Sequence, residues 1–116
     1  MLRTILKSKI HRARVTEANL DYAGSITIDA ALMKKADLLA GEKVEVFNMA
    51  NAARFETYVI EGREGGGEIC LNGPAAHLGS VGDSVIIVSY ILVEEREARK
   101  VKPKIVFVDE RNRIKD

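Results

Sequence analysis

The sequence predicts a mainly β protein, folded as a closed or nearly closed β-barrel with one or two short helices. Two observations lead to this fold class. Short runs of alternating apolar and polar residues recur along most of the chain, separated by turn-forming glycine or asparagine residues. Helical spacing of apolar residues, in contrast, is clear only over 30–40. A barrel is favoured because closure removes the exposed edges that an open sheet of short strands would leave.

The individual elements follow from local patterns. Asp29 is a typical N-cap for the helix, and Gly41 is a typical residue to end it. The glycines of 64–68 indicate a tight turn between two strands. The predicted strands are 10–18, 25–29, 43–49, 53–63, 69–73, an apolar run at 83–93 expected to be buried on both sides, and 103–110; a short charged helical turn is expected at 94–100 and a frayed tail at 111–116.

The composition predicts one soluble domain spanning 1–116. Eighteen basic and seventeen acidic residues give a formal net charge of +1, which disfavours nucleic acid or anionic membrane as a partner. Cys70 is the only cysteine, so no internal disulfide forms and a cytoplasmic location is expected. The apolar run 85–93 is far shorter than the roughly 20 residues that span a bilayer.

The dipeptide Gly24-Ser25, within "NLDYAGSITID", allows several interpretations. It can be a simple turn that leads into a strand. It does not fit the nucleophile elbow of a serine hydrolase, because Ala23 and Thr27 occupy the two glycine positions of that motif. The other glycine-rich stretch, 61–68, does not fit a phosphate-binding loop either, because it lacks the lysine and hydroxyl that phosphate and magnesium require.

Self-processing is the remaining interpretation of this dipeptide. The Ser25 hydroxyl would attack the carbonyl of Gly24 and convert the amide into an ester, and a residue without a Cβ helps the backbone to reach the necessary geometry. Elimination of that ester would leave dehydroalanine at position 25, which hydrolyses to a pyruvoyl group with loss of ammonia. The protein would then carry a cofactor made from its own chain.

Three stretches carry a family resemblance: "LKSKIHRARVTEANLDYAGSITID", "ARFETYVI" and "LNGPAAHLGSVGD". Together, from Met1 to about Glu97, they resemble the bacterial aspartate 1-decarboxylases, pyruvoyl enzymes that make β-alanine for pantothenate synthesis. The resemblance implies a double-psi β-barrel, a cytoplasmic homotetramer, cleavage between Gly24 and Ser25, and a covalent pyruvoyl cofactor derived from Ser25. It leaves open whether another protein assists maturation.

The resemblance also implies roles for the residues that bind L-aspartate, whose amine would form a Schiff base with the pyruvoyl ketone. Arg54 suits a bidentate grip on a carboxylate. Lys9 would bind a substrate carboxylate, and His11 would help to orient the substrate. The two residues are two positions apart on one strand, so their side chains point to the same face. Tyr58 would return a proton to the carbanion as general acid.

The other implied site residues surround the cleaved bond. Thr57 and Asn72 would donate hydrogen bonds to the Gly24 carbonyl oxygen during processing. Tyr22 would shape the cleavage site or contact substrate. The backbone beside the pyruvoyl group would come from Gly73, Pro74 and Ala75.

Two alternatives from other classes remain open, and no metal site is expected. The segment "SITIDAALMKKADLLAGEKVEVF" also resembles the swapped-hairpin transcription regulators, although its basic and acidic residues are interleaved. An inactive structural barrel is the other alternative. Cys70 and His77 lack further ligands at zinc spacing, so they do not suggest a metal pair.

Overall fold

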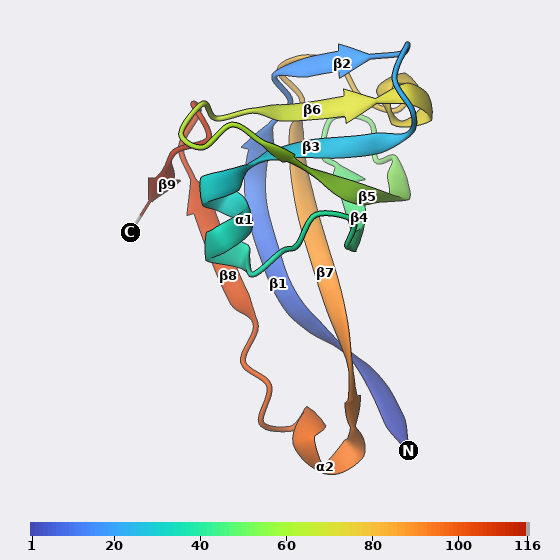
Figure 1. Ribbon diagram of the computed structural model, residues 1–116, viewed down its shortest axis with the longest axis vertical. Helices are drawn as coiled ribbons and strands as arrows, with labels where there is room; N and C mark the ends of the chain where they lie inside the picture. The colour runs from blue at the N-terminus through green and yellow to red at the C-terminus, as the bar shows by residue number, and fades with distance from the viewer. Residues whose placement is uncertain (116) are drawn as a thin grey trace.

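The computed structural model describes residues 1–115 as a mainly β molecule in which short strands cross above two long ones (Figure 1). Within these residues the elements are β1 (Leu2–Arg14), β2 (Glu17–Asn19), β3 (Ser25–Asp29), α1 (Ala30–Ala36), β4 (Lys43–Asn48), β5 (Arg54–Gly62), β6 (Ile69–Asn72), the 3-10 helix η1 (Gly73–His77), β7 (Ser84–Glu94), α2 (Glu95–Ala98), β8 (Lys104–Val108) and β9 (Ile114–Lys115). The prediction of a mainly β fold with one or two short helices is confirmed.

The strands are hydrogen-bonded in the order β2-β6-β3-β5-β4-β7-β1-β8-β9, which departs strongly from the order along the chain. Three of the pairs are parallel: β1 with β8, β2 with β6, and β3 with β5. The long β1 and β7 run side by side down the molecule, and β3 lies between β6 and β5 across their upper end (Figure 1). The strand that begins at Ser25 is therefore held on both edges.

The core is formed by the inward-facing residues of the alternating runs. Isoleucine, valine and leucine side chains of seven strands pack there with one face of α1; the most deeply buried are Ile10, Val15, Ile26, Ile28, Leu32, Val44, Val46, Val59, Ile69, Leu71, Val85 and Ile87. Their alternation with exposed polar residues is the pattern from which the strands were predicted. Burial of these side chains is the main stabilising contribution to the fold.

Asp29 caps α1 as predicted, and it also holds the glycine turn. Its Oδ1 accepts hydrogen bonds from the backbone N–H of Ala31 at 2.8 Å and of Gly65 at 2.9 Å, and its Oδ2 accepts from Gly67 at 2.7 Å. Burial alone would raise the pKa of Asp29, but these backbone donors outweigh it and leave the pKa below its ordinary value. The charged carboxylate thus fixes the end of β3, the start of α1 and the turn before β6.

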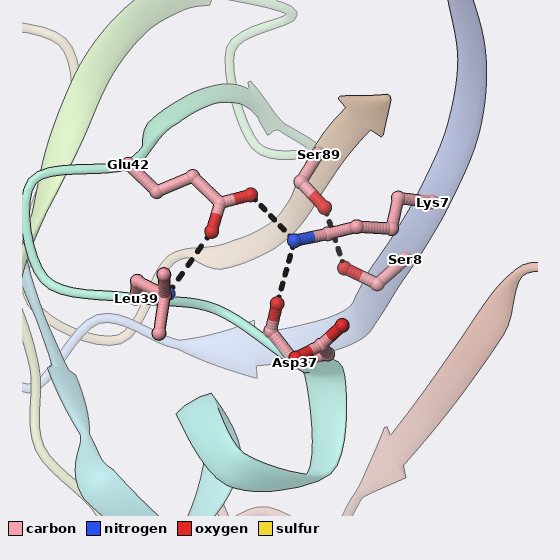
Figure 2. A network of polar contacts seen from close by, with 6 residues as sticks. All are labelled: Lys7, Ser8, Asp37, Leu39, Glu42 and Ser89. Atoms are coloured by element: carbon pink, nitrogen blue, oxygen red, sulfur yellow. Dashed lines mark hydrogen bonds and ion pairs between the residues drawn. The ribbon is translucent and has the colours of Figure 1, made fainter. Parts of the chain in front are cut away.

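The helix ends earlier than the sequence suggested. It was expected to continue through Leu39 to Gly41, but it stops at Ala36, with Asp37 in the left-handed conformation at φ 56°. Figure 2 shows the contacts made at this point: the Lys7 amino group on β1 donates to the Asp37 carbonyl and to the Glu42 carboxylate, both at 2.6 Å. These long-range contacts, with the hydrogen bond from the Leu39 N–H to the Glu42 carboxylate, hold the loop after α1 in a non-helical path, in which Leu39 is exposed.

Only the first half of strand β7 is buried, whereas the whole strand was predicted to be. Its first half lies in the core, whereas Tyr90, Ile91 and Leu92 in its second half are exposed. The reason is that β1 and β7 extend together beyond the rest of the sheet towards α2 (Figure 1). Because successive side chains point to opposite faces, both faces of this extension are at least partly exposed within residues 1–115.

The expectation of a frayed tail is wrong for residues 111–115; residue 116 lies outside the described part. Asn112 is buried and accepts a hydrogen bond from the Arg14 N–H at 2.7 Å. It donates to the carbonyl oxygens of Arg14 and Gly67, both at 2.8 Å. The adjacent β9 pairs with β8, so the tail is an integral part of the sheet.

Residues 1–115 contain no helix with both the length and the hydropathy that crossing a membrane would require.

Candidate active site

The Ser25 hydroxyl lies in a buried polar cluster formed by β3 and β6. Ser25 and Asn72 are directly opposite in the antiparallel pairing, and Thr27 is opposite Cys70, so the four side chains share one face. Asn72 donates from Nδ2 to Ser25 Oγ at 2.8 Å and to Thr27 Oγ1 at 3.0 Å. The Ser25 hydroxyl donates in turn to the carbonyl oxygen of Ala23 at 3.4 Å. Its position is therefore set by one donor and one acceptor.

Gly73 brings the start of η1 into close approach with the segment that precedes Ser25. Its φ of 60° lies in the left-handed region, and a Cβ there would collide with the Tyr22 carbonyl oxygen and lie 2.8 Å from the Gly24 nitrogen. Gly24 is similarly close to its neighbour, since a Cβ on it would lie 3.2 Å from Pro74 Cδ. The two glycines permit the backbones to pack at this distance.

A cleft of about 320 Å³ opens directly beside the Gly24-Ser25 bond. Gly24 forms one part of its wall because the parallel pairing of β3 with β5 sets the start of β3 beside the middle of β5. The cleft is lined by Gly24, Phe55, Glu56, Thr57, Tyr58, Pro74, Ala75 and Leu78. Five of the predicted site residues therefore line one cleft within a single chain: Gly24, Thr57, Tyr58, Pro74 and Ala75.

Lys9, His11 and Arg54, the three expected carboxylate-binding cations, are not among the residues that line this cleft. The register places all three on one outer face of the sheet formed by β5, β4, β7 and β1, which we call the cation face. The Arg54 guanidinium carbon lies 4.2 Å above the centre of the Phe47 ring on this face. In the sheet order, β4 and β7 separate Lys9 on β1 from β5, the strand that lines the cleft.

His11 packs edge-on against Phe107 of the neighbouring β8, with ring centroids 5.7 Å apart. Burial lowers the pKa of His11 below its ordinary value, and the charges of Arg12 and Lys9 lower it further. The imidazole is therefore neutral at pH 7, which suits an orienting hydrogen-bond partner better than a carboxylate counter-ion. The Tyr22 side chain is exposed, while its backbone carbonyl lies against Gly73 beside the Gly24-Ser25 bond.

Two residues of the buried cluster were not predicted as site residues, although the sequence contains a signal for them. Thr27 follows Ser25 by two positions and Cys70 precedes Asn72 by two, so the period of a strand puts each pair on one face. Cys70 was interpreted as a buried strand residue, which is confirmed. Burial raises the pKa of the Cys70 thiol to about 11, and the Glu17 carboxylate contributes through its charge and a 3.6 Å contact. The thiol is protonated at neutral pH and is not a nucleophile.

Among residues 1–115 no group of three or more histidine, cysteine, aspartate or glutamate side chains is arranged to hold a metal ion.

A family model described as aspartate decarboxylase matches residues 1–115. The chain belongs to the aspartate decarboxylase family. The aspartate 1-decarboxylase of Thermoanaerobacter pseudethanolicus is 58% identical over 97% of this chain and 97% of its own length. That of Corynebacterium efficiens is 61% identical over 98% of this chain and 84% of its own length. The resemblance inferred from the motifs is thereby confirmed, and the DNA-binding and inactive-barrel alternatives lose their support.

A solved structure supports the fold assignment independently. A rationally designed double-psi β-barrel protein matches with a TM-score of 0.51 at 26% identity, over 74% of this chain and 94% of the designed one. The predicted double-psi β-barrel is confirmed. In this aspartate decarboxylase family member the barrel places β3 between two neighbours, which is what presents the Gly24-Ser25 bond at the cleft.

The close approach at Gly73 predicts an unusually costly substitution. Gly73→Ala should lower the free energy of unfolding by about 3 kcal/mol or more, because the Cβ adds both left-handed backbone strain and a collision with the Tyr22 carbonyl. The matched control is Gly41→Ala, where φ is 85° and no atom lies within 4 Å of the added Cβ, so only about 1 kcal/mol of strain is expected. Denaturant unfolding of both variants measures the difference, and equal losses would contradict the packing argument.

Proposed function

We propose that this chain is a single self-processing domain that cuts itself between Gly24 and Ser25 and then, as a pyruvoyl enzyme, decarboxylates L-aspartate to β-alanine and CO₂. The observation that carries the proposal is the buried Ser25 hydroxyl, hydrogen-bonded to Asn72 and adjoining a cleft lined by Thr57 and Tyr58. Membership of the aspartate decarboxylase family supports the substrate. β-Alanine made in the cytoplasm would supply pantothenate biosynthesis.

Processing begins at the Gly24 carbonyl carbon. Ser25 Oγ bonds to this carbon while the bond from the carbon to the Ser25 nitrogen breaks, and the nitrogen gains the hydroxyl proton, so an amide becomes an ester. Asn72 holds Oγ from one side, and the Ala23 carbonyl directs its proton from the other. Thr57, in the cleft wall beside Gly24, suits the donor that stabilises the developing charge on the Gly24 oxygen.

The ester then breaks by elimination. The Ser25 Cα loses its proton, the bond from Cβ to the ester oxygen breaks, and Gly24 leaves as a free carboxylate. The resulting dehydroalanine takes up one water and releases one ammonia, which leaves a pyruvoyl group at the start of the fragment 25–116. Gly24 lines the open cleft, so water can reach this position.

The residues around the cleft fit the group that this chemistry would produce. A pyruvoyl group supplies an electron sink for the electron pair left when the α-carboxylate departs as CO₂. The missing Cβ atoms at Gly24 and Gly73 leave space beside position 25, and Pro74 and Ala75 close it with backbone and small side chains. Tyr58 is partly exposed in the same cleft, where its phenol can return a proton to the substrate carbon.

We further propose that the chain works as a homotetramer in which the cation face of one copy adjoins the cleft of another. Aspartate brings two carboxylates to the site, yet Lys9 and His11 do not line the cleft of their own chain, and two strands separate β1 from β5. Large exposed apolar side chains flank the cation face, as expected of a surface that another copy covers: Tyr90, Leu92, Ile105 and Phe107. Arg54 and Lys9 would then hold the substrate across the interface.

If L-aspartate is the substrate, the protein should discriminate it from L-glutamate. The purified protein should release CO₂ from L-aspartate at least tenfold faster than from L-glutamate, because one extra methylene moves the second carboxylate away from the fixed cations. Release of CO₂ from each amino acid measures the ratio, with Ser25→Ala as an uncut and inactive control. A faster rate on glutamate would contradict the assignment of L-aspartate as the substrate.

The proposed interface predicts complementation between two inactive variants. Ser25→Ala lacks the reactive group and Lys9→Ala lacks a carboxylate-binding cation, so each alone should be inactive. If Lys9 serves the cleft of a neighbour, co-expression of the two variants should restore about a quarter of parental activity, because mixed tetramers contain interfaces with both functional residues. No recovery above the separate variants would show that Lys9 acts within its own chain or not at all.

A further inference from the structure

Asn72 can donate to Ser25 only in the amide orientation that directs Nδ2, and not Oδ1, at Ser25 Oγ. An amide turned by half a revolution occupies the same space but exchanges Nδ2 for Oδ1, so the choice depends on which neighbours donate and which accept. The Ser25 and Thr27 hydroxyls can do either, and therefore neither of them selects an orientation. The selection must come from the third neighbour of the amide.

That third neighbour is Cys70. Its Sγ lies 3.0 Å from Asn72 Oδ1, closer than to its other acceptors, the Glu17 carboxylate at 3.6 Å and the Leu71 carbonyl at 3.9 Å. Both side chains are buried on the same face of β6, two residues apart. A protonated thiol is a weak donor and a weak acceptor, but an amide oxygen is a much better acceptor than a thiol sulfur, so the thiol favours Oδ1 over Nδ2 as its neighbour.

We propose that Cys70 is a positioning residue for self-processing: its thiol donates to Asn72 Oδ1 and so keeps Asn72 Nδ2 directed at Ser25 Oγ. This inference rests on the proposed function. Glu17 supports the arrangement from the far side of the sulfur, since burial and this carboxylate keep the thiol protonated. With the amide reversed, the Ser25 hydroxyl would donate to Oδ1 and its proton would turn away from the Ala23 carbonyl.

The test follows cleavage of the full-length chain as it is made. A pulse of labelled amino acid in cell-free translation, followed by a chase, separates the precursor from the 25–116 fragment and yields a processing rate. Cys70→Ser keeps a donor at the same place and should process within about threefold of the parent. Cys70→Ala and Cys70→Val lack the donor and should process about fivefold more slowly, the factor to which a net hydrogen-bond contribution of about 1 kcal/mol converts.

Packing alone would give a different order. Alanine and serine have nearly the same volume and differ at this buried position only in the hydroxyl, so a purely structural role predicts that Cys70→Ser is no faster than Cys70→Ala. Melting temperatures measured with Ser25→Ala in each chain show whether a slow variant is simply unfolded, and Cys70→Val remains informative if Cys70→Ala does not fold.

The outcomes separate this inference from the proposed function. A parent chain that never cleaves contradicts the proposed function itself, and with it the role of Cys70. A parent that cleaves while all three variants match its rate, or while Cys70→Ser is as slow as Cys70→Ala, overturns the positioning role alone.

Discussion

The hydrogen bond between Asn72 and the Ser25 hydroxyl is the interaction on which the account of this molecule depends. It exists because β3 and β6 pair in antiparallel register with the two residues directly opposite each other. The pairing can bring the chains so close only because Gly73 has no Cβ where the Tyr22 carbonyl and Gly24 nitrogen approach it. A sheet contact thus becomes a chemical constraint, since it holds one hydroxyl beside one peptide bond.

The remainder of the fold serves to hold this contact in place. Asp29, at the end of β3, binds the N-terminus of α1 and the glycine turn that leads into β6. Asn112 joins the same turn to the end of β1, and Lys7 joins β1 to the loop after α1. Each of these links uses a buried or half-buried polar group that bonds to backbone atoms, and Lys7 also pairs with the Glu42 carboxylate. Strained or closely packed positions such as Gly73 persist where the surroundings are fixed to this degree.

The sequence predicted best the features that depend on near neighbours. The strand pattern, the Asp29 cap and the turn at 64–68 all follow from residues a few positions apart. The end of α1 was missed because it depends on Lys7, thirty residues away, and the ordered tail was missed because Asn112 binds partners on β1 and the glycine turn. Strand order decides where Lys9 and Arg54 lie relative to the cleft, and no local pattern encodes that order. The residues of the cleavage motif were found from a family resemblance, whereas Thr27 and Cys70 follow from strand periodicity alone once β3 and β6 are known to be adjacent.

In the proposed maturation, the Gly24-Ser25 bond breaks and Ser25 becomes the cofactor. An intact mass spectrum of the purified, denatured protein tests it most directly. The account predicts two fragments, 1–24 and 25–116, with the larger one lighter than a serine-started chain by the mass of one ammonia. A larger fragment that begins with serine would contradict cofactor formation, and a single uncut chain after prolonged warming would contradict unassisted self-processing.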